Sequence, residues 1–79
     1  MFALLKQSDA RAVRQVLRGR RDRFDTLVKR YLPAVYAVSY AQLRNHADAE
    51  DVAQEAFLTA FISLHTLREP HKFEGWVVS

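Results

Sequence analysis

The sequence has no cysteine, only two glycines and two prolines, and no long hydrophobic run. The absence of cysteine excludes a disulfide framework, a thiolate zinc site and a thiol nucleophile. No apolar run is long enough to cross a bilayer, and the opening Met-Phe-Ala-Leu-Leu is too short for the hydrophobic region of a signal peptide. We therefore expect a soluble chain, in keeping with a cytoplasmic setting.

A chain of 79 residues can form one domain with a small core. Nearly half of the residues (49%) are hydrophobic, and helix-breaking residues are scarce, which favours a compact helical domain over disorder or a turn-rich β fold. We predict an all-α fold, a small bundle of three to four helices in which a long Pro-kinked helix packs on a central amphipathic helix.

The net charge of +3 hides an asymmetry between the two halves of the chain. Up to Arg44 there are ten Lys or Arg against three acidic residues, and from Asn45 onward there are two against six. The halves should therefore have different partners or pair partly with each other. The basic side chains could track phosphate or form a solvated helix face, and apart from Phe24 no aromatic residue interleaves them: Arg11, Arg14, Arg18, Arg20, Arg21, Arg23, Lys29 and Arg30.

The first half predicts a short helix followed by a long one. Ser8 is the expected N-cap of the first helix, which should stop near Gly19. The second helix is expected from about Arg23 to Arg44, capped by Asp22 and kinked near residues 29–33 by a proline. Tyr36 and Tyr40 could stack along its edge, while these side chains are expected to point inward: Phe24, Leu27, Val28, Tyr31, Val35, Val38 and Leu43.

The central helix is predicted over residues 48–64, with Asp48 as its N-cap. Its main apolar side chains recur at three- and four-residue steps, the spacing of one buried helix face: Val52, Ala53, Ala56, Phe57, Ala60, Phe61 and Leu64. A second line on the same helix begins acidic and ends apolar: Asp51, Glu55, Leu58 and Ile62. Apolar residues outside the core stripe indicate a partner-binding face. We expect residues 65–72 to form a loop and Phe73 to begin a fourth helix.

The motif Ala-Glu-Asp-Val-x-Gln-Glu-x-Phe within residues 49–57, followed by Phe73-Glu74-Gly75-Trp76-Val77, resembles region 2 of the bacterial RNA polymerase sigma factors of the extracytoplasmic-function (ECF) group. The resemblance extends back through the long preceding helix, on Phe24, Leu27, Tyr31, Pro33, Val35, Ala37 and Leu43. It implies one sigma region 2-like domain over residues 1–79, a fragment of a longer chain that lacks region 4.

The resemblance also implies a transcription initiation domain that binds core RNA polymerase and helps to recognise and melt the minus-ten promoter element. In the family, the helix matching residues 48–64 docks on a coiled-coil of the largest polymerase subunit. By position, the residues in this role are Asp51, Gln54, Glu55 and Leu58. An acidic and amide rim beside an exposed leucine suits such a surface. A purely structural reading leaves Asp51 to stabilise the helix start and Glu55 to face solvent.

The segment from residue 65 to the start of the last helix matches the part of the family that opens DNA and holds an unstacked base. Here Arg68, His71 and Lys72 could meet phosphate, and Trp76 could stack on a base or act as a wedge. Alternatively, Phe73 and Trp76 belong to the core.

Two other classes of function remain open. His46 and Glu50 lie four residues apart near other carboxylates, so a metal enzyme can be imagined, although no Glu-x-x-His pair is present. A helical protein-interaction module without a DNA role is the other alternative. We expect no enzyme activity, no cofactor and no metal. The resemblance implies an anti-sigma factor as a further partner, and the exposed apolar rim could dimerise the isolated domain.

Overall fold

The computed structural model describes residues 2–78, and every regular element in this range is helical. The elements are α1 (Phe2–Leu17), α2 (Asp22–Leu43), α3 (His46–Ser63), the 3-10 turns η1 (Leu64–Thr66) and η2 (Pro70–Lys72), and α4 (Phe73–Val78). The predicted all-α bundle is therefore confirmed. The two ends of the predicted domain, residues 1 and 79, lie outside the described residues.

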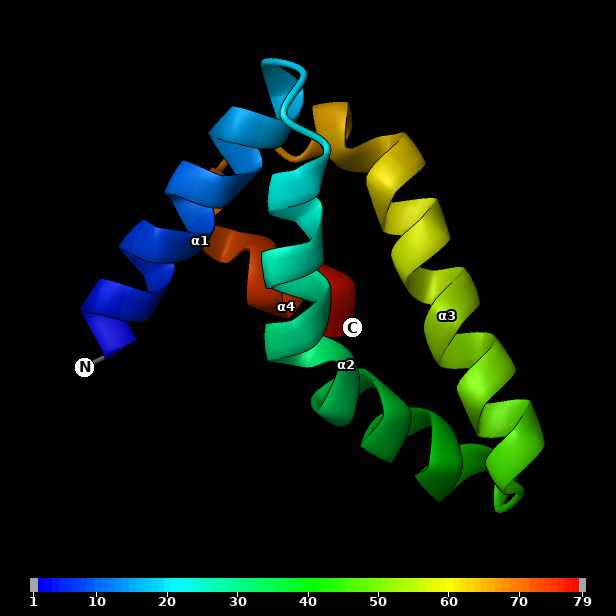
Figure 1. The fold of residues 1–79 in the computed structure, drawn as a ribbon. Coiled ribbons are helices and arrows are strands. Elements are labelled where there is room, and N and C mark those ends of the chain that lie inside the picture. Colours follow the sequence, from blue (N-terminus) through cyan, green and yellow to red (C-terminus); the bar gives the residue numbers. More distant parts are fainter. Residues whose placement is uncertain (1, 79) are drawn as a thin grey trace.

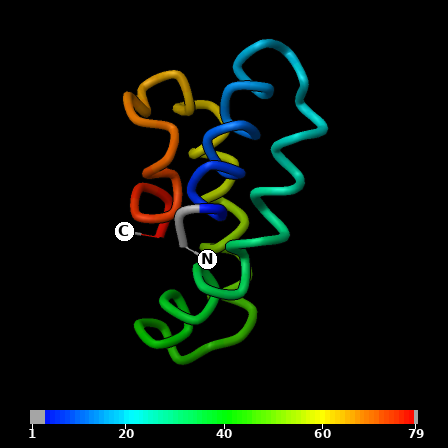
Figure 2. The backbone as a smooth tube through the Cα atoms, turned by 90° about the vertical axis from the view of Figure 1, so that its left-hand side faces the viewer, coloured from blue at the N-terminus to red at the C-terminus, as the bar shows by residue number. Residues whose placement is uncertain are grey.

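The helices form an open arrangement around α2. Figure 1 shows α2 and α3 running antiparallel from a tight corner, with α1 on the other side of α2. In the view turned by 90°, α1 lies nearest the viewer, with α2 to one side of it and the C-terminal segment that contains η2 and α4 to the other (Figure 2). This places η2 and α4 against α1, although more than fifty residues separate them in sequence.

The first helix begins earlier than the sequence pattern predicted. The expectation that Ser8 caps it is wrong, because α1 starts at Phe2 and Ser8 lies within it. Asp9, read as a first-turn residue, is only 1% exposed and is bonded to Arg30 and Tyr31 of α2. The break at Gly19 is as expected, since this residue has a φ of 102°, which glycine adopts without steric cost.

The long helix α2 has the expected length and bend, but not the expected cap. Residue Pro33 lies inside it, and α2 changes direction near its middle in Figure 1. Asp22 is not the N-cap: it is the first residue of α2, and the cap position falls on Arg21, whose side chain makes no capping bond. The carboxylate of Asp22 instead lies 3.3 Å from the guanidinium of Arg20, which holds the pKa of Asp22 below its usual value.

The corner between α2 and α3 is built from two consecutive residues. Arg44 ends α2 in the left-handed conformation, with a φ of 56°, and donates its backbone N–H to Tyr40. Asn45 then caps α3, because its side-chain oxygen accepts the backbone N–H of Asp48 at 3.0 Å. The prediction that Asp48 is the cap is therefore wrong by three residues. The apolar periodicity of α3 begins after its first turn, so the sequence pattern did not show where the helix starts.

Replacing Asn45 with alanine should lower the free energy of unfolding by about 1 kcal/mol, the usual cost of a lost N-cap. Asp48→Ala should cost less, since Asp48 only faces the positive end of the helix dipole. Urea unfolding followed by circular dichroism compares the two variants. A larger loss for Asp48→Ala would contradict the assignment of Asn45 as the cap.

The core lies where α1, α2, α3 and α4 meet. Fully buried side chains include Val13, Leu27, Leu64 and Phe73. The rest of the buried cluster is Ala12, Val16, Phe24, Tyr31, Val35, Ala53, Phe57 and Ala60. Most of the predicted inward residues of α2 and α3 are therefore in this core or packed against it.

Three of the predicted inward residues are exposed instead. Val38 and Leu43 are 42% and 44% exposed, because beyond the bend α2 has left α1 behind and lies beside α3 (Figure 1). Ser39 is buried in their place and donates its hydroxyl to the carbonyl of Val35 at 2.9 Å. Val52 is 43% exposed at the edge of the buried face of α3.

Candidate functional site

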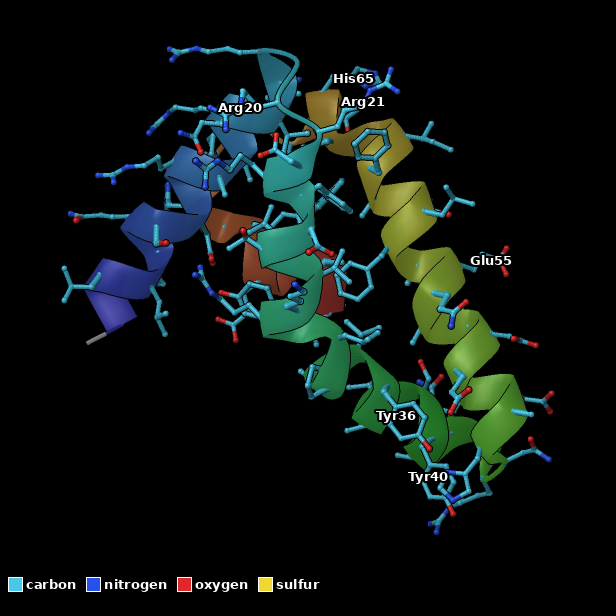
Figure 3. All side chains as sticks on the ribbon, in the orientation of Figure 1. Arg20, Arg21, Tyr36, Tyr40, Glu55 and His65 are labelled. Atoms are coloured by element: carbon cyan, nitrogen blue, oxygen red, sulfur yellow. The ribbon has the colours of Figure 1, made fainter. Side chains whose placement is uncertain are left out.

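The outward side of α3 carries the residues predicted to bind polymerase. Here "the α3 outer face" means Asp51, Gln54, Glu55, Leu58 and Ile62, and all five are exposed. In Figure 3, Glu55 projects away from the rest of the bundle. Helical geometry places this face opposite the side of α3 that carries the buried Ala53, Phe57 and Ala60. The structure thus brings the predicted residues together on one accessible surface.

The α3 outer face combines acidic and apolar groups. Leu58 and Ile62 are 61% and 65% exposed, so the described residues leave most of each side chain open to solvent. Asp51 and Glu55 form no salt bridge with any described residue. An apolar strip flanked by uncompensated carboxylates is suited to a helical partner that carries basic and apolar side chains.

An aromatic cluster lies at the α2–α3 corner, beside the start of α3. Tyr36 and Tyr40 stack with ring centroids 6.1 Å apart, as predicted from their spacing (Figure 3). His46, which the sequence pattern did not place, stacks on Tyr40 at 4.7 Å and shares a hydrogen bond with the hydroxyl of Tyr36. The imidazole of His46 therefore holds the corner between α2 and α3 together. As for a metal site near His46, the structure of residues 2–78 shows no group of three or more His, Asp or Glu side chains that could hold a metal ion.

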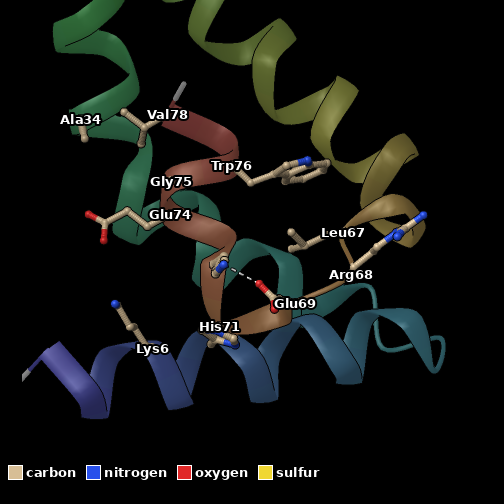
Figure 4. Close-up of a pocket in the computed structure, with 11 residues that line it drawn as sticks. Lys6, Ala34, Leu67, Arg68, Glu69, His71, Glu74, Gly75, Trp76 and Val78 are labelled. Atoms are coloured by element: carbon tan, nitrogen blue, oxygen red, sulfur yellow. Dashed lines mark ion pairs between the residues drawn. The ribbon is translucent and has the colours of Figure 1, made fainter.

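The residues predicted to meet DNA surround a hollow beside η2 and α4 (Figure 4). Arg68, His71, Lys72 and Trp76 all line it, so the structure brings these four together. Lys72 is paired with Glu69 at 2.6 Å, and this bond holds the pKa of the Glu69 carboxyl below its usual value.

The two aromatic residues of α4 differ in their environment. Phe73 is completely buried and contacts the rings of Phe24, Tyr31 and Trp76 at centroid distances of 6.2, 5.9 and 6.0 Å. It is a core residue, as the structural alternative predicted. Trp76 is half-buried against this core and also borders the hollow, so one part of its ring is fixed by packing while another part faces the opening.

The basic residues of the first half fall into two groups. Within residues 2–78, the cations that form salt bridges are Arg20, Arg23, Lys29, Arg30 and Lys72. Three of the others lie on the exposed side of α1 and just beyond its end: Arg11, Arg14 and Arg18. The basic residues that follow one another closely in the sequence therefore separate in the structure into cations that form salt bridges and arginines on the exposed side of α1 that do not.

A buried polar cluster between α1 and α2 was missed in the sequence. The Arg30 guanidinium lies 2.5 Å from one carboxylate oxygen of Asp9, and the hydroxyl of Tyr31 donates to the other oxygen. Burial and the adjacent Asp9 carboxylate raise the pKa of Tyr31 well above its usual value. No sequence signal marks this cluster, since Asp9 looks like an ordinary first-turn acid. It fixes α1 on α2 and so sets where the side chains of α1 point.

Comparison with known proteins identifies the family. The family model for sigma-70 region 2 matches residues 27–79, which include α3, η1 and η2. Because this match covers more than half of the chain, the protein belongs to the sigma-70 region 2 family.

Three curated relatives are similar to this chain, and two of them are named as ECF sigma factors. The ECF RNA polymerase sigma factor SigW of Bacillus subtilis is 35% identical over 82% of this chain and 35% of its own length. The RNA polymerase sigma-H factor of Pseudomonas aeruginosa is 32% identical over 94% of this chain and 38% of its own. The ECF RNA polymerase sigma factor SigE of Mycolicibacterium smegmatis is 39% identical over 68% of this chain and 21% of its own. The predicted membership in ECF sigma region 2 is confirmed.

The chain spans less than two fifths of the length of these relatives. No solved structure matches it significantly. Among the described residues, no helix is both long enough and apolar enough to cross a membrane.

Proposed function

We propose that this domain binds core RNA polymerase through the α3 outer face and helps to melt the minus-ten promoter element with the segment from η1 to α4. Membership of the sigma-70 region 2 family supports the class of function. The observation that carries the assignment of the surface is the exposure of Leu58 and Ile62, at 61% and 65%, beside two carboxylates that form no salt bridge with residues 2–78.

The α3 outer face has the chemistry that a basic and apolar coiled-coil requires. Burying Leu58 and Ile62 against a partner removes apolar surface from water and supplies affinity. Asp51 and Glu55 supply charge complementarity, which accelerates association and selects the register of the partner helix. Because the buried side of α3 holds the domain together, the polymerase would dock without disturbing the core.

The DNA role rests on the hollow beside α4. Extruding a base from a duplex costs a few kcal/mol, and stacking on an aromatic or arginine side chain can return about 1 to 3 kcal/mol per base. Trp76 at the edge of the hollow is held by Phe73, so its ring is already oriented before DNA arrives. Arg68 and His71 are exposed at the same opening and would contact the phosphates on either side.

The remaining parts of the proposal follow from this mode of action. The domain would act by binding, without catalysing a reaction of its own, in the cytoplasm and as part of a longer chain. An anti-sigma factor would inhibit it by covering the α3 outer face. In the absence of either partner, the same apolar strip would favour self-association of the isolated domain at high concentration.

Reversing the charge of Glu55 tests the polymerase-binding face. Glu55→Lys should weaken binding to the coiled-coil of the largest polymerase subunit by about tenfold or more, because a favourable pairing becomes a repulsion. Isothermal titration measures the affinity, and circular dichroism should show unchanged helicity, since Glu55 makes no salt bridge within residues 2–78.

The matched control is Glu74→Lys, which makes the same charge change at an exposed residue of α4. Its affinity for the coiled-coil should stay within about twofold of the parent, because α4 does not belong to the docking face. Equal losses of affinity in the two variants would mean that binding to the coiled-coil depends only on the net charge of the domain. Equal affinity of Glu55→Lys and the parent would remove Glu55 from the interface.

A further inference from the structure

A second hollow lies along α1, distinct from the hollow beside α4. It is lined by Lys6, Gln7, Ala10, Arg11, Arg14, Gln15, Arg18 and His71, and is here called the α1 groove. Ala10 is buried at its base, and the charged residues around it are exposed. Every ionisable side chain in this lining is basic or a histidine, and no carboxylate takes part. The groove is therefore a concave surface of one charge sign.

The three arginines of the groove are spaced for a repeating partner. Arg11, Arg14 and Arg18 follow one another at steps of three and four residues, which aligns them on one side of the helix. At 1.5 Å per residue, Arg11 and Arg18 are about 10 Å apart along the axis. The three guanidinium groups therefore form a row along α1 that could contact several phosphates of one strand.

The cations of the α1 groove form no salt bridge with the described residues of the domain. Within residues 2–78, none of the groove arginines forms a salt bridge, and neither does Lys6. The one acidic residue of α1, Asp9, is on the buried side of the helix, where Arg30 neutralises it. Guanidinium groups that are exposed, unpaired and gathered in a concave surface are suited to phosphate, which they can bind with two parallel hydrogen bonds.

The α1 groove is continuous with the hollow proposed to hold DNA. Lys6 and His71 line both hollows, and Figure 4 shows them between α1 and the segment that carries η2. The packing of η2 on α1 creates this continuity. A strand whose base lies near Trp76 could therefore pass His71 and Lys6 and reach Arg11 and Arg14 in the α1 groove.

We propose that the α1 groove binds the phosphate backbone of the DNA strand that leaves the hollow beside α4. This extends the proposed function, on which it rests, by giving the domain a sequence-independent contact outside the minus-ten site. Phosphate contacts position a protein on DNA, whereas base contacts specify the sequence. The groove would thus hold the opened strand in place and add affinity for any sequence.

The test is the salt dependence of DNA binding. Fluorescence anisotropy with a labelled single-stranded oligothymidylate gives the affinity of the full chain as salt is raised. Three phosphate contacts on a single strand contribute about 2 to the slope of log affinity against log salt. The variant Arg11→Gln/Arg14→Gln/Arg18→Gln should lower the slope by about this amount and weaken binding by about tenfold or more at low salt. Glutamine is a good helix former, so helicity should be retained.

Two further variants distinguish the effect of losing charges in the α1 groove from the effect of lowering the net charge of the chain. Arg21→Gln/Arg23→Gln/Lys29→Gln removes three charges outside the groove lining and should change the slope by less than half as much as the groove variant. The variant Arg11→Lys/Arg14→Lys/Arg18→Lys keeps the charges and should retain most of the slope. Equal slopes for the groove and control variants, or no binding by the parent, would overturn the proposal.

Other measurements distinguish failure of the groove assignment from failure of the proposed function on which it rests. Binding of the parent to the polymerase coiled-coil together with unchanged DNA slopes would overturn the groove assignment and leave the proposed function standing. Failure to bind either the coiled-coil or DNA would overturn both. Stronger arginine-dependent binding of polyglutamate than of the oligonucleotide would identify the groove as a protein-docking surface and contradict the proposal.

Discussion

Replacing Arg30 by methionine is expected to destabilise the domain by about 3 to 5 kcal/mol, the typical cost of leaving one member of a buried ion pair without its partner. Asp9 is 1% exposed and would keep only the hydroxyl of Tyr31 as a partner. A domain of this size has a total stability of about 4 to 12 kcal/mol. The variant should therefore be partly or largely unfolded, as measured by urea unfolding at neutral pH.

The neighbouring residue supplies the control. Lys29 forms a salt bridge with Asp25 at 3.0 Å, but both side chains are more than 60% exposed. Lys29→Met should change stability by less than about 0.5 kcal/mol, since exposed pairs four residues apart contribute little. The double variant Asp9→Asn/Arg30→Met should recover more than half of the loss, because the uncompensated charge is gone and the Tyr31 hydroxyl keeps an acceptor. Equal losses for Arg30→Met and Lys29→Met would contradict this account of the cluster.

Phe73→Ala is the second large effect, with an expected loss of about 3 to 5 kcal/mol. Phe73 is completely buried, and its ring meets Phe24 of α2, Tyr31 of α2 and Trp76 of α4. Truncation leaves a cavity at the point where α4 joins the core, so DNA binding at the neighbouring hollow should weaken along with stability. Thermal unfolding and oligonucleotide anisotropy measure the two effects.

A truncation on the surface provides the comparison. Leu58 is 61% exposed, so Leu58→Ala removes apolar atoms that already face water. It should change stability by less than about 0.5 kcal/mol. A loss for Phe73→Ala as small as that for Leu58→Ala would mean that α4 is not anchored as the structure indicates.

Helical periodicity predicted the elements of this fold because each long helix buries one side. Phe24, Leu27 and Tyr31 follow three- and four-residue steps and form the inner side of α2. Helix starts were less predictable, since the periodic pattern begins only where packing begins. Asn45 caps α3 about two turns before Val52, the first strongly apolar residue of this helix, and the first turns of α1 carry no clear stripe.

The candidate site was predictable to the extent that it depends on helix geometry. Residues at 51, 55 and 58 share a side of α3 in any α-helix, and the structure adds that this side is uncovered. The α1 groove was not predictable, because His71 reaches α1 only through the packing of η2. Nor could the sequence separate Arg30, which neutralises a buried carboxylate, from Arg11 and Arg14, which remain unpaired within residues 2–78.

The two stability predictions bear directly on function. Arg30 and Asp9 fix the rotation of α1, which decides that Arg11 and Arg14 face the groove. Phe73 fixes α4, which decides that Trp76 borders the hollow. The interior of this small domain thus positions the hollow beside α4 next to the basic α1 groove, and it leaves the α3 outer face available for a protein partner.

The central claim is that the α3 outer face docks on core RNA polymerase, and a titration of the unmodified chain against the isolated coiled-coil of the largest polymerase subunit tests it most directly. The account predicts saturable binding that weakens as salt is raised and that becomes weaker by about tenfold or more in Glu55→Lys. A folded, helical chain that shows no binding to the coiled-coil would contradict it, and would favour a protein-interaction module with a different partner.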